Sequence, residues 1–275
     1  MKKYFNPNKV GGFLLTVALL TSFLTLKPEI MDAQSATGVK NIVLVHGSFA
    51  DGSGFESVYK ILKKKGYNVS VASNPNTGFE GDVAATQRTL DRQNGPVILV
   101  GHSYGGAIIT EAGNDSKVVG LVYIDAFVPD ANETLLQLLQ SGPPATKSGI
   151  LPPDANGYVW YDKAKYHSGF CADLPKEQAE FLADSQLPIS AAIFGASIAN
   201  PAWKSKPSWY VVGTEDETIV PDGQRFMAQR AGAKITEIKG SHLVFMSQPK
   251  AVAEVIEMAA KNAKPSGKAA TTGGK

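Results

Sequence analysis

Ser103 stands between a predicted strand and a predicted helix. Residues 97–100 are four consecutive apolar residues, which is typical of a buried strand, and residues 107–112 predict a helix. The link reads Gly-His-Ser-Tyr-Gly-Gly, the Gly-x-Ser-x-Gly pattern of a nucleophile elbow. Side chains at Gly101 or Gly105 would crowd such a turn. Although a short glycine-rich turn can carry an incidental serine, the strand before it and the helix after it favour a nucleophile.

A serine hydroxyl is a weak nucleophile unless a base takes its proton, and His242 is the histidine that we expect to do so. It follows the last predicted strand, on a loop that can reach the elbow. His102 is next to the serine and is expected to point away from the open face of the site. His46 is expected to hold the loop after the first strand by hydrogen bonds. His167 lies in an irregular segment described below. A structural role is the alternative for His242.

Three acidic residues could orient the base. Asp216 follows the penultimate predicted strand and fits the chain order serine, acid, histidine. Asp125 also ends a predicted strand, the one after the elbow, and Glu215 is the neighbour of Asp216. We take Asp216 first, Asp125 as the alternative acid and Glu215 third. Each could instead cap a turn or a helix.

An oxyanion needs two backbone N–H donors in this kind of site. One donor is expected from Tyr104, the residue after the serine. The other is expected from the glycine-rich loop after the first strand, where Ser48 is the first choice and Phe49 the second.

The predicted elements alternate between strands and helices, which implies parallel βαβ units and a sheet covered on both faces. We therefore predict an α/β fold with a mostly parallel central sheet, helices on both faces and a helical lid insertion. The predicted strands are 39–45, 67–71, 97–100, 118–124, 208–212 and 234–238, and the predicted helices are 55–65, 81–92, 107–112, 222–231 and 249–263.

The alternation fails between about 129 and 206. This segment holds two Pro-Pro pairs, short helical stretches at 134–140 and 176–184, and many aromatic residues. We interpret it as a lid that closes the site and lines an apolar pocket. The aromatic side chains could instead pack a small core within the insertion, and we expect both uses.

The first 35 residues have the order of a secretory signal peptide: lysines, an apolar run from 11 to 26, then small residues around 33–36. The apolar run is short for a membrane anchor, which is the alternative. The domain prediction is a signal peptide at 1–35, one catalytic domain at 36–262 and a disordered tail at 263–275. We expect a secreted or periplasmic protein with no stable membrane association after cleavage of the leader.

Composition excludes several other classes. The net charge is +2 and falls near zero without the leader, which argues against nucleic acid as a partner. Cys171 is the single cysteine, so an intramolecular disulfide is impossible. The four histidines and this cysteine form no metal-ligand pair at the usual spacings, and no GxGxxG or P-loop is present. We expect no metal and no cofactor.

These motifs together resemble the α/β-hydrolase superfamily, in particular its branch of small esterases and hydroxynitrile lyases. That branch includes plant methylesterases and bacterial carboxylesterases of the pyrethroid-hydrolase type. The resemblance runs from about residue 40 to 262, excepting the lid, and is carried by residues 43–47, 97–106, 127–130, 213–216 and 237–242. It implies a triad of Ser103, Asp216 and His242, with Ser48 and Tyr104 as oxyanion donors.

Two positions separate the hydrolases of this branch from its lyases. The lyases carry a threonine where this chain has Gly47, and a lysine where it has Leu243. Leucine cannot supply the charge that handles cyanide, so the resemblance implies hydrolysis. We expect a serine carboxylester hydrolase acting through an acyl-enzyme on small esters with an apolar or aromatic part. A lactone or C–C bond hydrolase or lyase is the alternative, followed by a non-catalytic small-ligand receptor. The sequence does not indicate an oligomeric state.

Overall fold

The computed structural model describes residues 38–263. The predicted signal peptide at 1–35 and residues 264–275 of the predicted tail lie outside the described residues. Within residues 38–263, no helix is both long enough and apolar enough to span a membrane.

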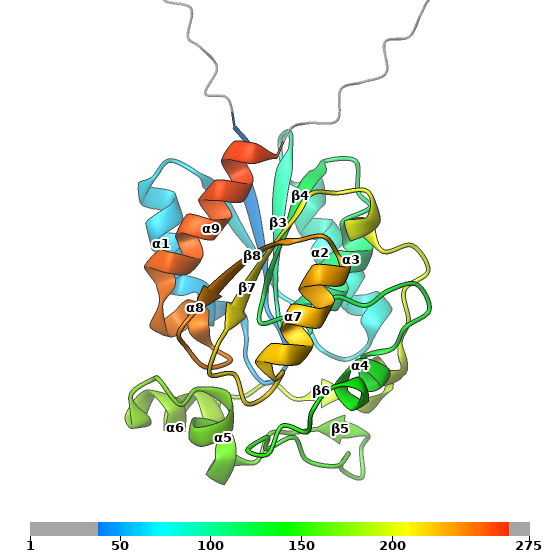
Figure 1. Cartoon of the computed structure of the whole chain (residues 1–275), viewed down its shortest axis with the longest axis vertical. Helices are drawn as coiled ribbons and strands as arrows, with labels where there is room; N and C mark the ends of the chain where they lie inside the picture. Colours follow the sequence, from blue (N-terminus) through cyan, green and yellow to red (C-terminus); the bar gives the residue numbers. More distant parts are fainter. Residues whose placement is uncertain (1–37, 264–275) are drawn as a thin grey trace, which may run out of the picture. The chain divides into compact units, whose positions relative to one another are not determined.

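The core of the domain is a six-stranded, wholly parallel sheet in the order β2-β1-β3-β4-β7-β8 (Figure 1). The four central strands are buried at every residue, because helices cover both faces of the sheet and the strand sequences are mainly apolar. The predicted α/β sheet is thereby confirmed. The strands are β1 (Asn41–Val45), β2 (Asn68–Ala72), β3 (Val97–His102), β4 (Val118–Ile124), β7 (Ser208–Gly213) and β8 (Lys234–Ile238).

Strand order decides which face each helix covers. The chain steps outward from β1 to β2 and then returns across β1 to β3, so right-handed crossovers put the first helix on one face and the next ones on the other. Figure 1 shows this arrangement, with α1 beside α9 and α2 beside α3. The helices are α1 (Glu56–Lys64), α2 (Phe79–Asp91), α3 (Gly105–Ala112), α7 (Pro221–Arg230), α8 (Val244–Ser247) and α9 (Pro249–Asn262), and a 3₁₀ turn, η1 (Gly52–Phe55), precedes α1.

A long insertion separates β4 from β7, in the segment where the sequence pattern fails. Its two strands pair antiparallel, apart from the main sheet. Sequence patterns indicated α4 and α6, whereas α5, β5 and β6 were not foreseen. The elements are α4 (Leu135–Ser141), β5 (Tyr158–Val159), α5 (Lys163–Phe170), α6 (Lys176–Asp184), β6 (Ile189–Ser190), η2 (Ala191–Gly195) and η3 (Ala202–Lys204).

The insertion is attached to the loops that follow β1 and β2. The amide of Phe49 donates to the carbonyl of Leu187 at 2.9 Å, and the Tyr166 hydroxyl donates to the Phe49 carbonyl at 2.7 Å. The amide of Ser190 donates to the carbonyl of Asn76 at 2.8 Å. These contacts hold the insertion at the carboxyl ends of the strands, where open α/β sheets bind ligands. Its role as a lid stays a prediction.

Candidate active site

Ser103 sits at the end of β3 in a strained left-handed backbone conformation, with φ of +53°. The turn is as tight as the sequence predicts. A Cβ on Gly101 would lie 2.5 Å from the carbonyl oxygen of Gly105, and one on Gly105 would lie 2.5 Å from the carbonyl oxygen of Val45. Only glycine fits at both places, so the two residues let the serine project at the tip of the turn.

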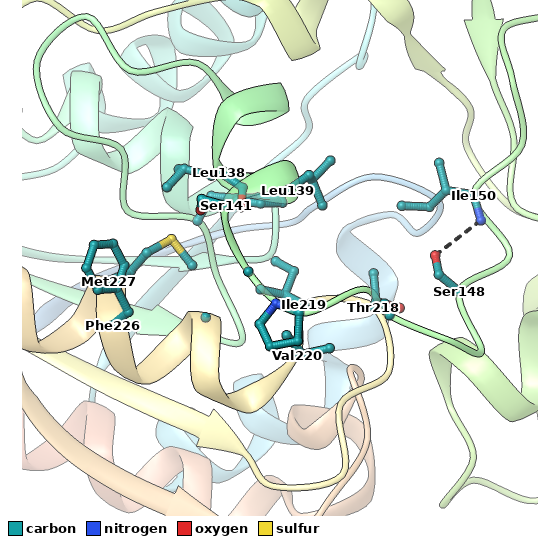
Figure 2. Close-up of a pocket in the computed structure, with 15 residues that line it drawn as sticks. Leu138, Leu139, Ser141, Ser148, Ile150, Thr218, Ile219, Val220, Phe226 and Met227 are labelled. Atoms are coloured by element: carbon teal, nitrogen blue, oxygen red, sulfur yellow. Dashed lines mark hydrogen bonds between the residues drawn. The ribbon is translucent and has the colours of Figure 1, made fainter.

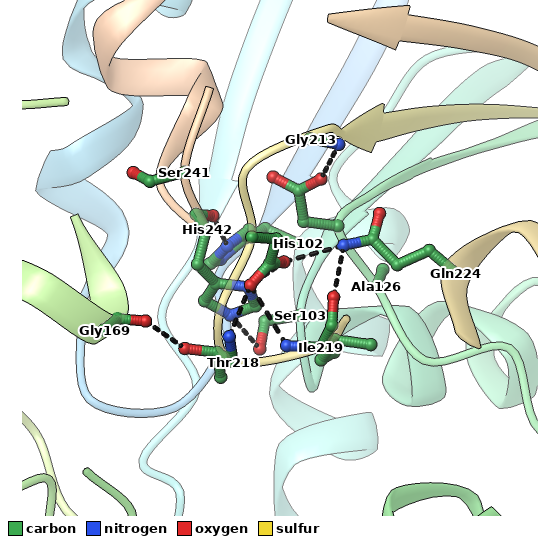
Figure 3. A network of polar contacts seen from close by, with 12 residues as sticks. His102, Ser103, Ala126, Gly169, Gly213, Thr218, Ile219, Gln224, Ser241 and His242 are labelled. Atoms are coloured by element: carbon green, nitrogen blue, oxygen red, sulfur yellow. Dashed lines mark hydrogen bonds and ion pairs between the residues drawn. The ribbon is translucent and has the colours of Figure 1, made fainter. Parts of the chain in front are cut away.

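Ser103, His242 and Asp216 form one hydrogen-bonded chain. Figure 3 labels Ser103 and His242 within this network. Nε2 of His242 lies 2.8 Å from Oγ of Ser103, and Nδ1 lies 2.7 Å from Oδ2 of Asp216. Ser103 is 5% exposed, Asp216 2% and His242 not at all. The imidazole can therefore accept the serine proton on one nitrogen while the carboxylate holds the other N–H.

Asp216 is held by three further donors. Its Oδ1 accepts from the backbone amides of Thr218 at 2.7 Å and Ile219 at 3.0 Å. Its Oδ2 accepts from Nε2 of Gln224 at 2.7 Å, in addition to His242. Sequence reasoning missed Gln224. Its helical spacing with the buried residues Met227 and Ala228 is the signal that places its polar side chain inside the protein.

The other two candidate acids lie away from His242's nitrogens. Glu215 is exposed and pairs with Lys239 at 3.5 Å. Asp125 is fully buried and accepts a 2.5 Å hydrogen bond from the Gly213 amide. Burial, reinforced by the nearby charge of Asp216, raises the pKa of the Asp125 carboxyl well above its ordinary value. The structure brings Asp216, and not these two, to the imidazole.

Two other histidines, His102 and His46, hold backbone segments next to the site by hydrogen bonds. Nε2 of His102 donates to the backbone carbonyl of His242 at 2.9 Å, and burial lowers its pKa well below the ordinary value, so it is neutral. His46 holds the loop after β1, as expected, because its Nε2 accepts from the Asn74 amide at 3.0 Å. His167 donates from Nε2 to the carbonyl of Leu174 within the insertion.

The oxyanion candidates lie beside the serine. Tyr104 precedes the first turn of α3, where backbone amides have no partner within the helix. Ser48 and Tyr104 line one small pocket together with Ser103. The amide of Phe49, the second choice, already donates to Leu187. Gly47 lies so close that a Cβ there would be 2.6 Å from Cβ of Ser103, which brings this loop against the nucleophile. The geometry therefore favours Ser48 over Phe49.

The pocket over Ser103 has room for about one water molecule, with a volume of about 20 Å³. It adjoins a pocket of about 200 Å³ through four shared wall residues, which are Phe127, Leu139, Ile150 and Thr218. Figure 2 shows the larger pocket between α4 of the insertion and the start of α7. No charged side chain is among its lining residues in the described part of the chain.

The aromatic residues of the insertion are used in both expected ways. Tyr161, Tyr166 and Phe170 pack against one another, and Phe170 also lies 4.9 Å from the His242 ring, centroid to centroid. Phe194 lines the pocket over Ser103. The insertion therefore shields the imidazole from solvent as well as building its own small core.

Metal-ligating groups do not gather in the described region. Across residues 38–263, no three histidine, cysteine or acidic side chains are grouped closely enough to hold a metal ion. Cys171 is a buried free thiol in this region, and burial raises its pKa to about 12. It is therefore a poor nucleophile.

The parallel sheet, the strained serine turn and the buried hydrogen-bonded chain define the class. The chain belongs to the alpha/beta hydrolase family, whose sequence model matches residues 42–255. The family resemblance stated from the motifs is thereby confirmed.

A plant methylesterase and a pyrethroid hydrolase, the kinds of protein named in the resemblance, are among the relatives. A carbendazim-hydrolysing esterase from Nocardioides sp. (strain SG-4G) is 30% identical over 164 residues, covering 53% of this chain; the chain spans less than two thirds, 64%, of that esterase. A methylesterase from Arabidopsis thaliana is 23% identical over 237 residues, covering 78% of this chain and 87% of the relative. The crystal structure of a pyrethroid hydrolase from Sphingobium faniae JZ-2 is similar with a TM-score of 0.70 at 25% identity, covering 82% of this chain and 98% of that one.

Proposed function

We propose that the protein is a serine carboxylester hydrolase that works through an acyl-enzyme. The observation that carries the proposal is the buried hydrogen-bonded chain from Ser103 through His242 to Asp216. Relatives named as esterases and as a pyrethroid hydrolase support ester chemistry. The predicted leader further supports the proposal that the enzyme is exported.

In the proposed first step Ser103 Oγ attacks the ester carbonyl while Nε2 of His242 takes its proton. Asp216 stabilises the imidazolium that forms. The backbone amides of Ser48 and Tyr104 donate to the developing oxyanion. His242 then gives the proton to the leaving alcohol, and a water molecule activated by the same nitrogen releases the acid in the second half of the reaction.

The pocket indicates the kind of ester. The wall next to Ser103 is tight, whereas the adjoining 200 Å³ pocket is lined mainly by apolar side chains. We infer an uncharged ester whose larger apolar or aromatic part occupies the adjoining pocket. Lyase chemistry of the hydroxynitrile type is disfavoured, because the position after His242 is Leu243, a fully buried apolar residue.

The test compares the wild-type protein with Ser103→Ala on p-nitrophenyl acetate, butyrate and octanoate. Wild type should turn over at least one ester and be inhibited by a p-nitrophenyl phosphonate that labels one serine, identified by mass spectrometry. Ser103→Ala should lose turnover by at least 10³-fold, since it removes the nucleophile, while its melting temperature stays within a few degrees. Hydrolysis retained by this folded variant would refute the mechanism.

A further inference from the structure

Tyr104 takes part in the site through its backbone and in a second network through its side chain. Its amide is a proposed oxyanion donor, whereas its buried hydroxyl donates to Oδ2 of Asp82 at 2.7 Å. Asp82 lies on α2, has no exposed surface and also accepts at Oδ1 from the Asn76 amide at 2.8 Å. One carboxyl thus binds the elbow on one side and the loop after β2 on the other.

Asn76 links Asp82 to the loop that supplies the other proposed oxyanion donor, Ser48. Its side-chain Nδ2 donates to the carbonyl of Gly47 at 3.3 Å, and Gly47 directly precedes Ser48. Asn76 is fully buried and has φ of +57°, a strained conformation that its surroundings must hold. A continuous path of hydrogen bonds therefore runs from Tyr104 through Asp82 and Asn76 to Gly47.

We propose that Asp82 is a positioning residue that fixes the spacing of the two oxyanion donors, the amides of Ser48 and Tyr104. The proposal rests on the proposed function, because it concerns the same oxyanion hole. The two donors belong to loops that follow different strands, β1 and β3, so strand pairing alone does not fix both loop tips. Such donors must lie within about 2.7–3.1 Å of the oxyanion, and displacement of a fraction of an ångström weakens them.

A carboxylate suits this task better than a neutral side chain. Burial raises the pKa of Asp82, because a charged carboxylate is costly to keep inside the protein. The Tyr104 hydroxyl and the Asn76 amide donate to the anion and act in the opposite direction on this pKa. Hydrogen bonds to a charged acceptor are shorter and stronger than neutral ones. The carboxyl of Asp82 can therefore hold the Tyr104 hydroxyl and the Asn76 amide at well-defined positions.

The test uses Tyr104→Phe, which removes the hydroxyl and keeps the ring, and Asp82→Asn, which keeps the shape but removes the charge. Tyr123→Phe is the matched control, because Tyr123 is also fully buried and its hydroxyl bonds to Thr110 on α3 at 3.0 Å, outside the path from Tyr104 to Gly47. The readouts are the second-order rate of Ser103 labelling by a p-nitrophenyl phosphonate, kcat and KM for the best ester, and the melting temperature.

We expect Tyr104→Phe to lower kcat and the labelling rate by about 10-fold with KM within twofold. Complete loss of one oxyanion donor costs about 10²–10³-fold, and here the donor is displaced rather than removed. Asp82→Asn should have a similar effect, and the double variant should be no worse than the more impaired single one, because both changes break the same path. Tyr123→Phe should lower the melting temperature comparably without changing the labelling rate.

The proposal is overturned if Tyr104→Phe and Asp82→Asn label Ser103 as fast as Tyr123→Phe does. Labelling of Ser103 by the phosphonate does not require ester turnover, so this result can be told apart from failure of the proposed function. Wild type that is labelled but hydrolyses no ester would overturn the ester assignment, while slower labelling of the two variants would still support the positioning role. Wild type that resists labelling would overturn both.

Discussion

Replacing Asp125 by asparagine should change how the stability of the protein depends on pH. Asp125 is fully buried beside Asp216, and its raised pKa means that it carries a proton in the folded protein at pH values where the unfolded chain has lost it. Folding then takes up one proton, so the free energy of unfolding falls as pH rises from the ordinary aspartate value near 3.9 up to the raised folded-state pKa. Asparagine keeps the shape and an oxygen to accept from the Gly213 amide, but it cannot titrate.

The magnitude follows from linkage. One proton bound only in the folded state makes the free energy of unfolding fall by about 1.4 kcal/mol per pH unit. The advantage of Asp125→Asn over wild type should therefore grow with pH, and by at most about 2.7 kcal/mol between pH 5.5 and 7.5, the limit set by one proton held across the whole window.

The assay is urea unfolding at half-unit steps from pH 5.5 to 7.5 and constant ionic strength, followed by tryptophan fluorescence and by circular dichroism to check for a two-state transition. Asp91→Asn is the matched control, because Asp91 ends α2 in an exposed position. The free energy of unfolding of Asp91→Asn, plotted against pH, should run parallel to that of wild type. If the Asp125→Asn curve is also parallel to wild type, then Asp125 is ionised in the folded protein and the reasoning is refuted.

Two further predictions concern the loops around the nucleophile. Gly105→Ala should lower the melting temperature by several degrees, because the added Cβ would lie 2.5 Å from the Val45 carbonyl oxygen and overpacking costs about 1–3 kcal/mol. Differential scanning calorimetry would measure this change. An unchanged melting temperature would contradict the tight turn. Asp173→Ala should lower kcat several-fold more than it changes KM. Asp173 accepts hydrogen bonds from the amide and hydroxyl of Ser241, next to His242, and from the Ser247 hydroxyl at 2.6 Å. A kcat equal to that of wild type in steady-state assays would show that these bonds do not position the histidine.

The central parts of the fold follow from local sequence patterns. Runs of mainly apolar residues predicted the four buried strands, because a parallel sheet covered on both faces needs no alternation of polar residues. The glycines around Ser103 predicted the turn because their pattern is local in the sequence, although the contact that requires glycine at Gly105 comes from Val45 on a neighbouring strand. The order of serine, acid and histidine then indicated which distant residues the sheet would bring together.

Residues that belong to no sequence motif and act through distant partners were not foreseen. Asp82 is one of two acidic residues in the predicted helix at 81–92, and only the fold brings it to Tyr104, 22 positions away. The choice between Asp125 and Asp216 likewise needed the path of the loop after β7, which the sequence pattern does not define. Helix α5 was missed because its hydrophobic residues lack a clear helical face, being packed on the rest of the insertion and on His242.

The attachment of the insertion at Phe49 limits how freely evolution or an engineer can exchange it. Segments at this place in a fold are often regarded as modules that alter specificity while the sheet is left intact. Here the Leu187 carbonyl and the Tyr166 hydroxyl bind both the amide and the carbonyl of one residue in the loop that carries Ser48. A transplanted segment must therefore supply an acceptor for the Phe49 amide and a donor for the Phe49 carbonyl. Without them, the loop that carries Ser48 would be displaced in the engineered protein.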